Sequence, residues 1–289
     1  MHLWLFLLAL AGLSNPLSHP PPTTRRAALT AATLPFLLRP LPSPAEALPP
    51  LPKVSSKLYL DVRIARSDGT FFTKPAASAP DPDPVFTGRL VLGVFGDVSP
   101  VCAAKFASFV APPSSDLPSY ASSTFPAVTL SPSGQSSLIS AGAVNGLSLT
   151  SVLGGSALSF GETLLPANLW LEDRAASPPL PVDRPGLLLH RNLDALPAFQ
   201  ISTGADGGLA GGYTVFGTVL EGRDVLDRIL EVGRYSTEAG PGVGGSEMFR
   251  EQNQFFKGVA KSIGDSRVDK VFDGKLLRKV EVVRAGTLS

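Results

Sequence analysis

Few residues of this chain have the type and spacing that catalysis or metal binding requires. His190 is the only histidine after residue 47, and no cysteine, aspartate or glutamate accompanies it at metal-ligand spacing. Cys102 is the only cysteine, so a disulfide within the chain and a thiolate metal cluster are both excluded. A serine triad would have to use His190, and no G-x-S-x-G motif occurs. The sequence therefore predicts no metal site and no cofactor.

Two other patterns also have plain structural interpretations. The carboxylate pair Glu172 and Asp173 stands beside the proline-rich run 177–185, and we expect this region to be a solvated loop. Residues 204–212 are rich in glycine, but they lie between two predicted strands instead of opening a helix. A hairpin loop is therefore predicted there, and a phosphate-binding loop is not.

The stretch 197–232 contains the clearest succession of elements. Residues 198–203 and 213–219 are apolar or alternating runs bounded by glycine, which predicts two strands. A turn follows at Glu221 and Gly222, and residues 223–232 are predicted to form a helix. Its apolar residues fall at helical spacing: Val225, Leu226, Ile229 and Leu230.

The rest of the chain adds strands on either side of a helix. Residues 57–64 alternate between apolar and polar side chains, which predicts a half-buried antiparallel strand. Residues 88–95 predict a second strand, and 99–110 a helix with Ser99 as N-cap. Its inward stripe would be Cys102, Phe106, Phe109 and Val110, with Cys102 a small buried hydrophobic residue. Residues 248–263 predict an amphipathic helix and 276–283 a closing strand.

These elements carry motifs in a fixed order. The C-terminal half has Phe199, Ile201 and Thr203, then Leu209, the run V-F-G-x-V at 215–219 and E-G-x-D-V at 221–225. The N-terminal half has G-R at 88–89, followed by Phe95, Asp97, Pro100 and Phe106. In this layout the chain resembles the cyclophilin-type peptidyl-prolyl cis-trans isomerases. The extra helix before the last strand is similar to that of plant thylakoid-lumen cyclophilins.

The resemblance implies a mainly β fold. We expect a closed antiparallel β-barrel with two capping helices and an extra C-terminal helix, spanning residues 57–289 with insertions. Closure would remove the exposed strand edges. Residues 48–56 would be a linker, and residues 1–47 a targeting region outside the fold.

The resemblance also implies a site in which the proline ring sits in an apolar pocket while an arginine stabilises the twisted peptide bond. The family's arginine position is Ala127 here, so no catalytic residue is assigned. The substrate-binding positions fall on Leu138, Ser140, Gln200, Leu209 and Tyr213. Loss of such a charged donor commonly lowers the rate by ~10²–10³.

Two functions follow from this altered site. The first is a peptidyl-prolyl isomerase that acts on X–Pro bonds of proteins, with weak or lost activity. The alternative is a non-catalytic protein-binding factor that assists assembly in the thylakoid lumen. The partners would be proline-containing peptides or lumenal proteins, and we expect the protein to be monomeric.

The N-terminus indicates export. Residues 1–14 form an apolar run, and Arg25 and Arg26 precede a second apolar run and the A-x-A motif at 45–47. Two such signals in tandem predict delivery to a plastid and then the thylakoid lumen; the alternative is a single signal and secretion. No later apolar run reaches transmembrane length, so no stable membrane insertion is expected. The net charge of +1 without basic clusters argues against nucleic-acid binding.

Overall fold

The computed structural model describes residues 48–73, 81–175, 178–235 and 273–288. They belong to one compact unit, Leu48–Ser289. The predicted targeting region 1–47 and the predicted helix 248–263 lie outside the described residues. Val54 and Ser55, in the expected linker, already contact the fold: Val54 packs against buried residues and the Ser55 hydroxyl donates to the carbonyl of Val94.

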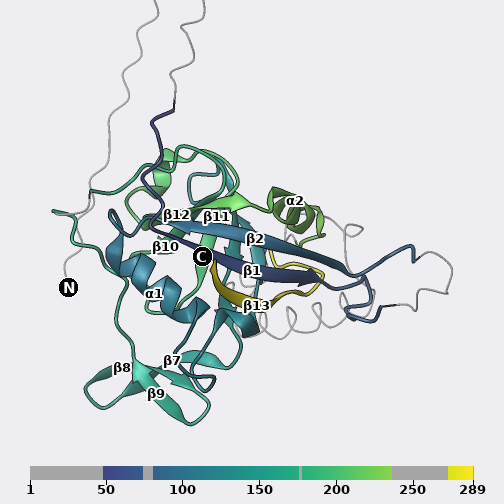
Figure 1. The fold of residues 1–289 in the computed structure, drawn as a ribbon, viewed down its shortest axis with the longest axis horizontal. Coiled ribbons are helices and arrows are strands. Elements are labelled where there is room, and N and C mark those ends of the chain that lie inside the picture. The colour runs from purple at the N-terminus through teal and green to yellow at the C-terminus, as the bar shows by residue number, and fades with distance from the viewer. Residues whose placement is uncertain (1–47, 74–80, 176–177, 236–272, 289) are drawn as a thin grey trace, which may run out of the picture. The chain divides into compact units, whose positions relative to one another are not determined.

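The fold is built on a ten-stranded antiparallel sheet in which β1, β2 and β13 run side by side (Figure 1). In sheet order the strands are β4 (Ala127–Leu130), β5 (Ser137–Ala141), β11 (Phe199–Ser202), β10 (Leu187–Arg191), β12 (Tyr213–Glu221), β2 (Phe86–Val94), β1 (Ser56–Ile64), β13 (Val280–Leu288), β3 (Ser123–Thr124) and β6 (Ala143–Val144). The predicted mainly β character is therefore confirmed for the described residues.

Strand β1 has the alternation that its sequence predicts. Leu58, Leu60, Val62 and Ile64 are buried, and the residues between them are partly exposed. Its neighbours hold it in register, with Leu60 opposite Leu90 of β2 on one side and Ala285 of β13 on the other. Alternate residues of a strand point to opposite faces, so this pairing directs one apolar face of three strands into the core.

The predicted closure of the barrel is wrong. The sheet is an open half-barrel with β4 and β6 as its end strands. Pro126 interrupts the run between β3 and β4, because proline has no N–H to donate to a sheet. The outer edge of β4 instead meets the chain before β13, where the amide of Val128 donates to the carbonyl of Gly274 at 2.8 Å.

Two helices of the described residues, α1 (Pro100–Val110) and α2 (Arg223–Glu231), are as predicted within one residue, and both pack against the same core (Figure 1). Ser99 is the N-cap residue of α1, but its hydroxyl donates to the carbonyl of Val215 instead of capping the helix. The cap comes from Glu172, whose carboxylate accepts from the amides of Cys102 at 2.7 Å and Val101 at 3.2 Å. Glu172 is thus a helix cap and not part of a solvated loop.

A short sheet of β7 (Leu147–Val152), β8 (Gly155–Phe160) and β9 (Thr163–Pro166) projects from the body (Figure 1). Two 3-10 turns, Tyr120–Ser122 and Gly207–Leu209, complete the elements of the described residues. Sequence analysis predicts neither this sheet nor these turns.

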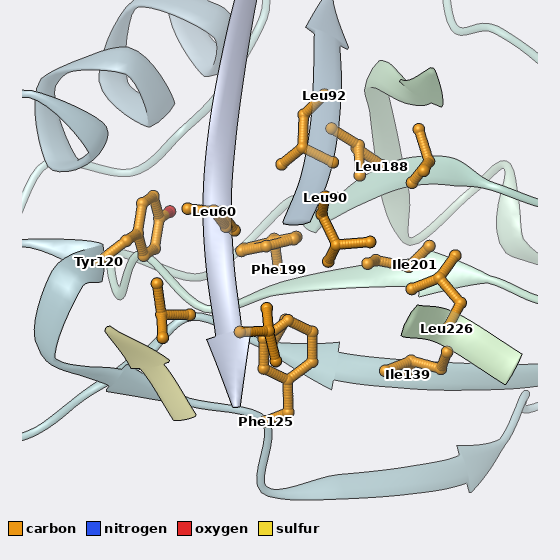
Figure 2. Packing of buried hydrophobic residues seen from close by; sticks show 14 of the residues in the cluster. Leu60, Leu90, Leu92, Tyr120, Phe125, Ile139, Leu188, Phe199, Ile201 and Leu226 are labelled. Atoms are coloured by element: carbon orange, nitrogen blue, oxygen red, sulfur yellow. The ribbon is translucent and has the colours of Figure 1, made fainter. Parts of the chain in front are cut away.

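The main core fills the inner face of the sheet. Figure 2 shows Leu60 and Leu90 packed with Phe199 and Ile201, which come from strands far apart in the sequence. At its centre, the ring centroid of Phe106 lies 4.9 Å from that of Tyr120 and 5.1 Å from those of Phe199 and Phe216. Phe106 therefore joins α1 to the sheet.

Replacing Phe106 with alanine should lower the free energy of unfolding by about 3–5 kcal/mol, because the surrounding rings cannot close the cavity. Urea denaturation of the full chain measures this change. Phe72→Ala is the control, since Phe72 is 61% exposed and its loss should change stability by under about 0.5 kcal/mol. Equal losses in the two variants would contradict this description of the core.

Candidate functional site

The predicted substrate-binding residues of β5 and β11 lie on the outer face of the sheet. On β5, Ile139 and Ala141 point into the core, so Leu138 and Ser140 point to the opposite side. On β11, Gln200 is directly opposite Ser140. Strand pairing therefore brings positions some 60 residues apart to one surface.

A row of side chains crosses this surface from β4 to β10. Ala127 of β4 is opposite Ser140, Ser140 is opposite Gln200, and Gln200 is opposite Leu189 of β10. Ala127 is thus the direct neighbour of Ser140, and Gln200 lies one strand further along the row. Among the described residues, the Gln200 side-chain oxygen is buried without a hydrogen-bond donor.

The other three predicted residues form an apolar cluster on the same face. Leu138, Leu209 and Tyr213 are 1%, 1% and 7% exposed and belong to a second core that is separate from the inner one. Its floor consists of outward-facing residues of three further segments: Phe95, Leu187, Leu189 and Val215. The five predicted residues therefore lie on one face, three in a buried apolar cluster and two in the adjoining polar row.

This apolar cluster is covered by residues 178–185 of the same chain, which we call the strap, and we call the surface beneath the strap the groove. Val182 is only 2% exposed within the apolar cluster, and Leu180 packs against that cluster. Pro179 and Pro181 are exposed, so burial alternates along the strap as in an extended segment. The amide of Asp206 donates to the carbonyl of Val182 at 2.7 Å. The expectation of a solvated loop at 177–185 is therefore wrong for these strap residues.

Asp206 fixes the wall of the groove, a role that sequence analysis does not assign to it. Its carboxylate accepts from the hydroxyls of Ser133 at 2.5 Å and Ser136 at 3.4 Å, and from the amide of Gly208 at 3.0 Å. Hydrogen bonds from Ser131 and Ser133 lower the pKa of Asp206. The D-G-G sequence at 206–208 was the available signal, since aspartate commonly bonds the backbone two residues on.

Arg174, which precedes the strap, and Arg184, which belongs to it, both have other partners. The guanidinium of Arg184 donates to the carboxylate of Asp183 at 2.7 and 2.8 Å and also to the carbonyl of Pro49. Arg174 donates to the carbonyl of Gly211 at 3.4 Å. Neither contact involves Ser140 or Gln200. A third arginine, Arg191 of β10, is exposed and lies directly opposite Tyr213.

His190 lies in the core, on the strand that forms the floor of the groove. Its ring stacks on that of Trp170 with centroids 4.2 Å apart, and Nε2 is 3.0 Å from the carbonyl oxygen of Leu196. Burial lowers the pKa of His190, and burial likewise raises the pKa of the Cys102 thiol. In the part of the chain that the structure describes, no group of three or more His, Cys, Asp or Glu could hold a metal ion.

Comparisons with known proteins give no family. No family model matches the chain, and no curated protein matches it. Within the described ranges, no helix combines the length and apolar character needed to cross a membrane.

Asp206→Ala should lower the free energy of unfolding at pH 7 by about 1–3 kcal/mol, because the buried hydroxyl of Ser136 loses its acceptor and the bonds from Ser133 and Gly208 are lost as well. The lowered pKa of Asp206 stabilises the fold above the ordinary carboxyl pKa, and this contribution is lost as pH falls through the folded value. The variant should therefore lose less stability than the natural protein between pH 5 and about pH 2, measured by urea denaturation. Asp116→Ala, at an exposed position, is the control.

His190 should make stability sensitive to mild acid. Its pKa is lower in the folded than in the unfolded chain, so the unfolded state binds more protons and stability falls as pH drops below about 6.5. His190→Gln should remove most of the change in unfolding free energy between pH 7 and pH 5. An unchanged pH profile in this variant would contradict the assignment.

Proposed function

We propose that this chain is a cyclophilin-like protein that binds extended, proline-containing segments of other proteins and catalyses X–Pro isomerisation weakly or not at all. One observation carries the proposal. Ala127, the position that the resemblance assigns to the family's arginine, is in register with Ser140, and Gln200 lies one strand further on the same face. This position therefore carries no charged donor.

The chemistry of the row argues against efficient catalysis. Rotation about a peptide bond has a barrier of ~20 kcal/mol, and catalysis requires groups that bind the twisted state more tightly than the planar one. A methyl group at Ala127 donates no hydrogen bond. Arg174 and Arg184 bind other groups. Arg191 lies opposite Tyr213 on β10, three strands away from β4, and is not in register with Ala127. A loss of ~10²–10³ in rate is expected from the missing donor.

The same face is suited to binding. An apolar groove next to polar groups is typical of sites that take an extended peptide, with pockets for side chains and hydrogen bonds for the backbone. The buried oxygen of Gln200 has no donor among the described residues, and such an acceptor is costly unless it is paired. The N–H of a bound peptide would supply the pair.

We further propose the thylakoid lumen as the site of action, with lumenal proteins as partners. This rests on the twin arginine at 25–26 and the two apolar runs of residues 1–47. Secretion through a single signal is the alternative.

A protease-coupled isomerisation assay of the full chain tests the catalytic half of the proposal. The natural protein should accelerate isomerisation of a proline-containing test peptide by less than about one hundredth of what an intact site of this type achieves. Ala127→Arg adds the missing donor, and Ala127→Gln is the control that adds length without charge. Any gain should be confined to the arginine variant.

Strong activity in the natural protein that a cyclophilin inhibitor abolishes would contradict this half of the proposal. In that case another residue would have replaced the arginine, and the isomerase function would stand.

A further inference from the structure

We propose that the strap, residues 178–185, is an intramolecular ligand of the groove, and that partner segments bind by displacing it. This inference rests on the function proposed above. It names the class of ligand: an extended segment in which aliphatic side chains alternate with prolines, as in the strap's own P-L-P-V sequence.

The side chains of the strap occupy the groove as those of a bound peptide would. Val182 and Leu180 are inserted among the predicted substrate-binding residues, and the intervening Pro181 faces solvent. The prolines hold the segment extended, which lowers the entropic cost of binding. The strap places aliphatic side chains, and no proline ring, in the groove. The strap is therefore bound there without its X–Pro bonds being placed for isomerisation.

The backbone of the strap is held by few bonds. Two hydrogen bonds join it to the groove in the described residues, from the amide of Asp206 to Val182 and from the hydroxyl of Ser202 to Arg184, the latter at 2.9 Å. Four of the eight strap residues are prolines, which have no amide proton to donate. The strap therefore does not form a strand of the sheet, and its removal breaks no strand ladder.

A tethered ligand has a high effective concentration, commonly in the millimolar range, so a free peptide of equal intrinsic affinity competes poorly. The apparent dissociation constant equals the intrinsic constant divided by the fraction of molecules with the groove open. Weakening the strap should therefore increase the affinity for an added peptide.

The test uses the full chain and a fluorescein-labelled peptide with the strap sequence PPLPVDRP. Binding is measured by fluorescence anisotropy for the natural protein and for the double variant Leu180→Ser/Val182→Ser. We expect at least a roughly tenfold lower apparent dissociation constant for the double variant. The matched control is Val152→Ser/Leu153→Ser, which replaces the same residue types at 38% exposed and fully exposed positions of the β7–β8 hairpin. It should bind as the natural protein does.

A second variant covers the case in which the double variant does not fold. Pro179→Gly/Pro181→Gly changes two exposed positions and keeps Leu180 and Val182. Glycine raises the conformational entropy of the displaced strap, so the substitution favours the open groove. It should shift the affinity in the same direction by a smaller factor.

The outcomes separate this inference from the proposed function. Equally tight binding by the natural protein and the strap variants overturns the strap as a competing ligand while leaving a peptide-binding groove. An absence of binding by every folded variant overturns both.

Discussion

Strand β10 is buried on both faces, and this constraint determines much of the molecule. Leu187, Leu188, Leu189 and His190 are each 1% exposed or less, although they point alternately to opposite sides of the sheet. One side is covered by the inner core and by Trp170. The other needs a second cover, because apolar residues of three segments meet there and would otherwise face water. The strap supplies that cover.

The strap covers the outer face of the sheet, so the same contacts stabilise the fold and close the proposed binding site. The contacts that bury Val182 also fill the groove in which a partner peptide would lie. In the proposed mechanism the groove is either covered by the strap or open with its apolar surface exposed. A ligand of similar chemistry would bury that surface in the open form. Ala127 offers no hydrogen-bond donor on this face, which accords with the binding function proposed above.

Two carboxylates beside the strap hold backbone segments in place. Glu172 caps α1 and so attaches the chain that leads into the strap to the helix. Asp206 ties the serine-rich loop to the turn that carries Leu209. Both groups lie next to the groove and determine its shape, and neither belongs to a cluster that could hold a metal within the described residues. These two carboxylates thus stabilise the positions of the segments that form the site.

The sequence by itself determined several of the regular elements. Periodicity predicts β1, β2, β11, β12, α1 and α2 nearly to the residue, because local apolar spacing reports which face is buried. The pairing of β5 with β11, which local spacing does not predict, brings Ser140 and Gln200 to one surface. Only the tertiary structure decided that the sheet stays open, that Glu172 caps a helix 70 residues away and that the strap fills the groove. These features depend on contacts between segments distant in the sequence, and no local pattern of side chains encodes which distant surface a segment will cover.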